Sequence, residues 1–133
     1  MTASINIVNT GWMVQLLFKL SSANMQSTSD QPFLPVAYSG SNYAITNIIA
    51  RQRTGGASVT CAGGIYDAAS KGGNAIVSAA QSWVTLASGV MVTATLAALT
   101  GTTLLANTPI LSLTTGSTAA CTADFYIFGV DLS

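Results

Sequence analysis

The sequence is short of charge. Only 6% of its 133 residues are charged, against about 25% in a typical soluble domain. Four are basic and four are acidic, Glu and His are absent, and the formal net charge is zero. A neutral chain has no electrostatic field that would gather nucleic acid or cations. We therefore expect no nucleic-acid partner and no bound metal.

The absence of His also removes most catalytic constellations. A Ser-His-Asp triad cannot be built, and the two cysteines show no metal-ligand spacing. The four Asp residues are scattered, and we expect Asp124 and Asp131 to lie on solvated strand faces. The order Ser70-Lys71-Gly72-Gly73 does not match the GxxxxGK[ST] order of a phosphate-binding loop. We predict that the protein is not an enzyme and uses no cofactor.

Long apolar runs are also missing. The most apolar window, residues 84–105, has Ser, Thr or Gly at nine of its 22 positions, whereas a membrane-spanning helix needs roughly 20 predominantly apolar residues. The first residues, MTASINIVNTGW, lack the basic and then apolar regions of a secretory signal. Cys61 and Cys121 both lie in apolar stretches, where we expect buried thiols and not a disulfide. No membrane partner is expected.

What the chain does have is apolar residues that alternate with polar ones. Positions 12, 14, 16, 18 and 20 are apolar, and residues 57–61 and 90–96 also alternate, as strands with one buried face do. Gly and Pro interrupt the chain at about the 8–12-residue spacing of an all-β fold, and no segment has a capped helical stripe. Strands are predicted near residues 4–9, 11–20, 43–52, 56–62, 74–86, 90–98, 109–115 and 122–131.

These patterns predict an all-β fold for a single domain over residues 1–133. The expected architecture is an antiparallel β-sandwich with a jelly-roll-like path, and an immunoglobulin-like sandwich is the alternative. A chain of this length can bury about two-thirds of the surface that its unfolded form exposes, so one ordinary core is possible.

Residues 21–42 do not fit the alternation. The segment is polar at first and then carries Pro32 and Pro35 among apolar residues. Over twenty residues without period in a small domain indicate a functional loop or an arm. The segment is either a long crossover that covers one end of the sandwich or an interface element. In the second case Phe33, Leu34 and Tyr38 are the predicted interface residues.

The stretch from Gly63 to Trp83 has two Gly-Gly pairs, at 63–64 and 72–73. We interpret it as a strand, a connecting loop and a strand, in which glycines supply positive φ or close backbone approach. Asp67 is expected to cap its local turn with a side-chain acceptor, and Lys71 is expected to be exposed. The stretch therefore predicts geometry and not chemistry.

The surface must be rich in hydroxyls, because Ser and Thr together supply 32 residues. A neutral surface of this kind has little repulsion to keep copies or neighbours apart. It suits a subunit that is normally packed against other protein.

Four segments resemble a known family. They are GGIYDAASKGGNAIV at 63–77, residues 81–86, LSLTTG at 111–116 and TADFYIFGVDL at 122–132. They are similar to small virion proteins of tailed bacteriophages, of the head decoration or cement type, and the likeness extends over about residues 43–132. The family pattern marks a fold and transfers no functional residue.

The resemblance implies a protein made in the host cytoplasm and located in the virion, on the phage head. Its implied partners are the major capsid protein and further copies of itself, with a trimer favoured and a dimer possible. The alternative is a tail or fibre-tip protein that binds a host-surface glycan. For that function Trp12, Tyr38, Tyr43 or Tyr66 would have to form an exposed aromatic platform.

Overall fold

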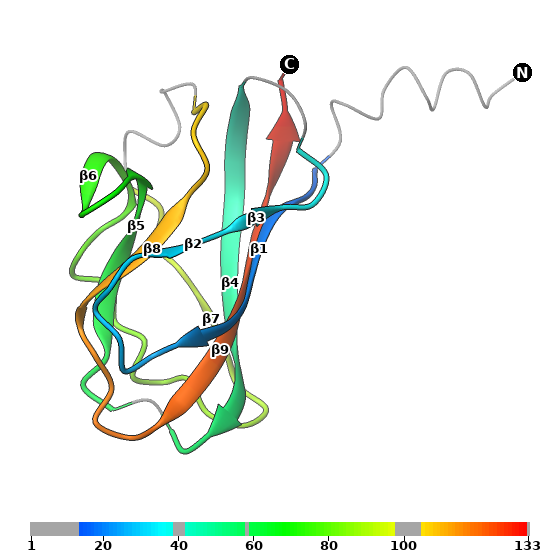
Figure 1. The fold of residues 1–133 in the computed structure, drawn as a ribbon. Helices are drawn as coiled ribbons and strands as arrows, with labels where there is room; N and C mark the ends of the chain where they lie inside the picture. Colours follow the sequence, from blue (N-terminus) through cyan, green and yellow to red (C-terminus); the bar gives the residue numbers. More distant parts are fainter. Residues whose placement is uncertain (1–13, 39–41, 58, 98–104, 133) are drawn as a thin grey trace, which may run out of the picture.

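The computed structural model describes residues 14–38, 42–57, 59–97 and 105–132 (Figure 1). Within these ranges the secondary structure is all β, and none of the described chain forms a helix long and apolar enough to cross a membrane. The strands are β1 (Gln15–Asn24), β2 (Gln31–Pro32), β3 (Leu34–Pro35), β4 (Tyr43–Gly55), β5 (Ala62–Ala68), β6 (Gly72–Val77), β7 (Met91–Thr93), β8 (Ile110–Thr115) and β9 (Cys121–Asp131).

The strands form two packed antiparallel sheets, as predicted. One has the order β3-β1-β9-β4-β7 and the other the order β2-β8-β5-β6. In Figure 1 the long strands β1, β9 and β4 form one layer, β5, β6 and β8 lie in the other, and the segment that contains β2 and β3 crosses between them.

The pairing follows the predicted jelly-roll path. β1 pairs with β9, β2 with β8, β4 with β7 and β5 with β6, which are the four pairs of one long eight-stranded hairpin. Wrapping that hairpin adds the β4–β9 and β5–β8 pairs and closes the two sheets. An immunoglobulin-like sandwich would pair its first two strands with each other, whereas β1 here lies beside the last strand.

The core lies between the sheets and is centred on Phe125 of β9. The ring of Phe125 packs edge-on against Trp83 at 5.1 Å and against Phe33 at 6.2 Å between ring centroids. The indole N–H of Trp83 donates to the carbonyl of Gly63 at 3.0 Å, so this large buried side chain has its polar group satisfied. Cys61 and Cys121 are both buried, and neither forms a disulfide, as expected.

The stretch from Gly63 to Trp83 begins with the predicted strand, loop and strand. β5 and β6 form a hairpin whose turn residues Ser70 and Lys71 both have positive φ, 56° and 59°, the pattern of a type I′ turn. Asp67 caps the hairpin as expected, since its carboxylate accepts from the backbone N–H of Asn74 at 2.6 Å and from the Asn74 side chain at 2.9 Å. Lys71 is exposed, as predicted.

The first glycine pair lies within β5 and not at a turn. A Cβ added to Gly64 would lie 2.3 Å from the carbonyl oxygen of Val77, and one added to Gly63 would lie 2.3 Å from the Cα of Leu113. Both positions therefore need glycine because the neighbouring backbones approach closely. The prediction that these glycines allow close backbone approach is confirmed, but the prediction that they lie at a turn was wrong.

Within the segment predicted over 21–42, the described residues 21–38 are more regular than the sequence indicated. Residues 21–24 complete β1, and Gln31–Pro35 supplies an edge strand to each sheet, β2 beside β8 and β3 beside β1. Before β2, the carboxylate of Asp30 accepts from the Ser70 N–H at 2.7 Å and from the Ser112 hydroxyl at 2.8 Å. The segment therefore connects the two sheets and is fixed at both of them.

Three predicted strands differ from the structure. Residues 56–61 are not in a strand, because β4 ends at Gly55 and β5 begins at Ala62. The strand predicted over 74–86 is β6, which ends at Val77, and the strand predicted over 90–98 is β7, which contains only Met91–Thr93. Residues 78–86 instead form turns that bury Trp83 and Leu86. The predicted strand over 4–9 and the start of that over 11–20 lie outside the described residues.

Candidate interaction surface

The cross-strand register defines which side chains of the five-stranded sheet face away from the core. Lys19 of β1 lies opposite Leu34 of β3 and opposite Tyr126 of β9, which in turn lies opposite Ile49 of β4. Residues paired across antiparallel strands project to the same side of the sheet. Phe18, the neighbour of Lys19, is fully buried. The row that contains Lys19 therefore points outward.

A second outward row lies one pleat away. Leu16 of β1 is opposite Phe128 of β9, and Phe128 is opposite Asn47 of β4. We use the name outer face for the surface formed by the side chains of these two rows. Its residues are Leu16, Lys19, Leu34, Asn47, Ile49, Tyr126 and Phe128.

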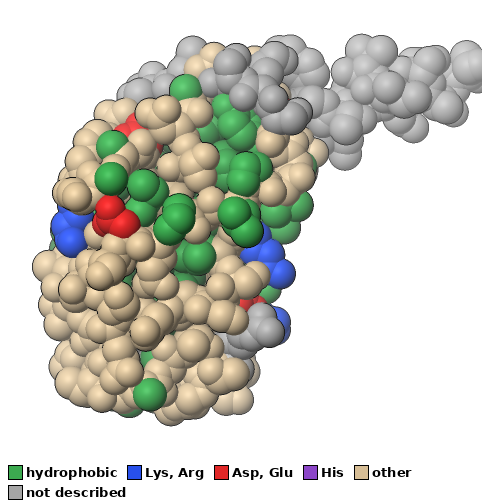
Figure 2. Space-filling model, viewed as in Figure 1, with side chains coloured by type: hydrophobic (Ala, Val, Ile, Leu, Met, Phe, Trp, Pro, Cys, Tyr) green, Lys and Arg blue, Asp and Glu red, His purple; other side chains and the backbone are tan. Residues whose placement is uncertain are grey.

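The outer face is unusually apolar for this position. An antiparallel sheet with one solvated side normally carries polar residues there, but the outward positions 126, 128 and 130 of β9 are Tyr, Phe and Val. Leu34 is 70% exposed and Val36, which follows β3, is 56% exposed. Figure 2 shows further hydrophobic side chains over the edge of the sandwich that β2 and β3 cross, with basic side chains on both flanks of this view.

The outer face occupies the middle of its sheet. At about 3.3 Å per residue and about 4.8 Å between strands, the sheet measures roughly 33 Å along the ten-residue strand β1 and roughly 19 Å across its five strands. The two rows of the outer face cover only part of that area, and a standard interface buries about 800 Å² per partner. The outer face is therefore large enough for the centre of a protein contact and not for the whole of it.

One cation lies within the apolar surface. The ammonium of Lys19 sits 5.4 Å from the centre of the Tyr126 ring, a cation–π contact. The Lys19 side chain is partly buried between its neighbours on the sheet. Among the described residues, no carboxylate forms an ion pair with it.

Beside it, the Arg51 guanidinium is held by its neighbours on the sheet. A hydrogen bond with Tyr126 raises the pKa of Arg51 above its ordinary value, and the nearby Asp124 carboxylate also raises it. Arg51 Nη2 lies 3.6 Å from Asp124 Oδ2, and the Ser22 backbone N–H donates to Asp124 Oδ1 at 2.8 Å. The expectation that Asp124 is solvated was wrong, because its side chain is only 2% exposed beneath this contact.

The β7 edge of this sheet carries a shallow depression of about 280 Å³. It is lined by Arg51, Gln52, Gly89, Val90 and Met91. Met91 lies opposite Arg51 in the register and is 63% exposed. Met91 therefore projects to the same side of the sheet as Arg51, and this charged side chain lies between Met91 and the apolar rows.

The three predicted interface residues have different environments. Phe33 is 1% exposed and packs on Phe125, so its side chain belongs to the core of the sandwich. Leu34 points outward. The Tyr38 ring packs at 5.2 Å from Phe18 and 4.9 Å from Tyr43, so it covers the end of the core.

The aromatic platform needed for glycan stacking does not form in the described structure. Tyr43 is fully buried and Tyr66 is 6% exposed. The Tyr43 hydroxyl donates to the Asn107 carbonyl at 2.5 Å, and burial raises the pKa of Tyr43. Burial also raises the pKa of Tyr38, with a smaller contribution from Asp131. Trp12 lies outside the described residues.

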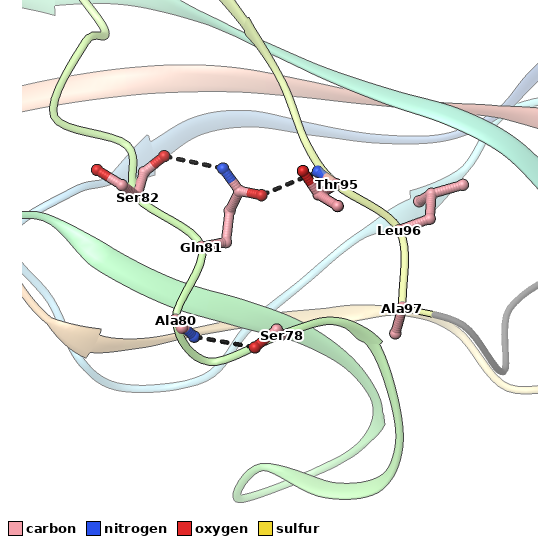
Figure 3. Close-up of a pocket in the computed structure, with 7 residues that line it drawn as sticks. All are labelled: Ser78, Ala80, Gln81, Ser82, Thr95, Leu96 and Ala97. Atoms are coloured by element: carbon pink, nitrogen blue, oxygen red, sulfur yellow. Dashed lines mark hydrogen bonds between the residues drawn. The ribbon is translucent and has the colours of Figure 1, made fainter.

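A second depression, of about 380 Å³, lies between two loop segments (Figure 3). Gln81 bridges them, since its side-chain oxygen accepts from the Thr95 N–H and its amide nitrogen donates to the Ser82 carbonyl, both at 2.9 Å. No charged side chain lines it. No group of three or more potential metal ligands occurs in the described part of the chain.

Comparison with known proteins returned no match to a family model, a curated protein or a solved structure.

Most of the outer face was missed by the sequence reasoning. A signal was present in ADFYIFGVD, where Phe125–Phe128 are four consecutive aromatic or β-branched residues, so that both sides of the strand are apolar over this stretch. A run that is apolar on both faces indicates a strand that is covered on both sides. The second covering element is not supplied by the described chain.

Proposed function

We propose that the chain is a structural protein of a bacteriophage virion, a decoration or cement protein that binds the outer surface of the head lattice and stabilises it. The observation that carries the proposal is the apolar outer face. A free sandwich would expose polar residues there, whereas a subunit that normally lies against another protein can keep apolar ones. The low charge of the chain and its resemblance to head proteins support the same assignment.

The mechanism would be mechanical and not chemical. Each copy would bury apolar area against the major capsid protein, and contact with more than one capsid subunit would oppose their separation. Association of copies, a trimer first and a dimer second, would multiply modest individual contacts through avidity. Lattice symmetry provides equivalent sites for such an arrangement.

The test uses phage heads purified without this protein. The wild-type chain is added, its occupancy is measured by quantitative gel analysis, and the temperature at which the heads open is recorded. We expect saturable binding and a higher opening temperature. Leu34→Gln should weaken binding, while the control Val84→Gln, which changes a 43% exposed valine on a loop, should not.

Failure of the wild-type chain to bind or protect heads, together with co-purification with tails, would refute this function. The neutral depression of Figure 3 would then favour the tail protein that binds a host glycan, because its lining offers hydroxyl and amide groups. Immunogold labelling of intact particles separates the two functions by showing label on the head or on the tail.

A further inference from the structure

The outer face has one feature that restricts its partner. Lys19 lies inside the apolar row, with Leu34 on one side and Tyr126 on the other. A partner that covers this row must take the ammonium out of water. Burying an unpaired charge is strongly unfavourable, and a single aromatic ring compensates only part of that loss.

The described part of the chain places no carboxylate in an ion pair with Lys19. Asp124, the carboxylate nearest in the register, already receives Arg51 and the Ser22 N–H. The described ionisable groups of the sheet's outward side are therefore Lys19, Arg51 and Asp124, with a net charge of one positive unit from two cations and one anion. A second copy docked face to face would bring two such positive surfaces together.

From this charge pattern we propose that the partner is an apolar protein surface that places a carboxylate against Lys19. The proposal rests on the function proposed above, and identifies the chemistry of the capsid patch that the outer face would contact. The ammonium would then lie between the partner's carboxylate and the Tyr126 ring, and the surrounding leucine and aromatic side chains would exclude water. A desolvated ion pair of this kind gives specificity, because a protein surface without the carboxylate would bury the Lys19 charge unpaired.

The test compares three variants on heads that lack the protein. Lys19→Met keeps the length and the apolar stem but removes the charge, Lys19→Arg keeps the charge, and Lys71→Met removes a lysine from the exposed turn of the other sheet. Thermal unfolding of each variant first establishes that the fold is intact. Binding is then measured at two salt concentrations.

We expect Lys19→Met to bind at least about thirty-fold more weakly, because it leaves the partner's carboxylate buried without a cation. Lys19→Arg should bind close to wild type, and Lys71→Met should be indistinguishable from it. Equal or tighter binding by Lys19→Met would overturn the carboxylate assignment and leave the head-binding function standing. No binding by the wild-type chain would overturn both.

Two further measurements distinguish other occupants of the face. Sedimentation of vesicles that contain phosphatidylglycerol tests an anionic lipid surface, and sedimentation velocity of the protein alone tests a second copy. Binding to vesicles that Lys19→Met abolishes, without binding to heads, would assign the face to lipid phosphate and refute the proposal. Self-association that Leu34→Gln abolishes, without binding to heads, would assign it to a second copy and also refute the proposal.

Discussion

Phe33 and Leu34 are neighbours in sequence with opposite environments, and their truncation separates packing from binding. Phe33 is 1% exposed and contacts the ring of Phe125, while Leu34 is 70% exposed. A buried phenylalanine replaced by alanine costs about 3–5 kcal/mol, the sum of lost transfer free energy and the cavity that remains. A substitution at an exposed site usually changes stability by less than about 0.5 kcal/mol.

The expected shifts in melting temperature follow from these values. For a chain of this size roughly 3–5 °C accompany each kcal/mol, so Phe33→Ala should melt about 10–20 °C below wild type and Leu34→Ala within about 2 °C of it. Differential scanning calorimetry or circular dichroism measures both. Head binding should show the reverse order at a temperature where both variants are folded, with Leu34→Ala the weaker binder.

A Leu34→Ala variant that is destabilised as much as Phe33→Ala would refute the reasoning. It would mean that Leu34 is packed against the domain in solution. The outer face would then lack its exposed leucine on the edge strand β3, and the argument for a docking surface would fail.

Three other perturbations test the local geometry. Asp67→Ala should lower the free energy of unfolding by about 1–3 kcal/mol, because its two hydrogen bonds to Asn74 are lost in a buried site, whereas Lys71→Ala should be nearly neutral. Gly64→Val should prevent folding, since even a Cβ there meets backbone at 2.3 Å. Asp30 has its pKa lowered by hydrogen bonds, so its contribution to stability is present above about pH 4 and is lost as the pH falls below it.

Each of these has a contrary outcome. Equal stability of Asp67→Ala and Lys71→Ala would show that the cap is dispensable, and a soluble, cooperatively melting Gly64→Val would show that β5 and β6 can separate there. The acid dependence is measured as melting temperature from pH 2 to 6. Asp30→Asn should flatten that curve at its acid end, and parallel curves for the two proteins would contradict the role of this carboxylate.

The sandwich could be predicted from sequence because its long strands carry their own signals. β4, β8 and β9 were located within a few residues, since each has β-branched or aromatic residues between turn residues. The two shortest strands, β2 and β3, could not be located. They have two residues each and form only because β8 and β1 offer an unpaired edge, which is a property of the folded sheets and not of the local sequence.

The environments of Phe33, Leu34 and Asp124 could not be predicted from the local sequence. Phe33 and Leu34 look alike in the sequence, and their separation into core and surface depends on the register between β1 and β3. A shift of one residue would exchange their environments. The charge of Asp124 was likewise interpreted as a sign of exposure, whereas the register places Arg51 opposite it and covers it.

The crossing segment Gln31–Pro35 has a consequence for how the protein behaves when it is concentrated. It terminates both sheets at once, and each of its two short strands contains a proline, Pro32 or Pro35, which has no N–H to offer to a further strand. Deletion of the segment would leave the open backbone of β1 and β8 in the same molecule. We expect such a variant to form fibrils on storage. If it failed to bind, the cause would be its polymerisation and not the removal of a contact residue.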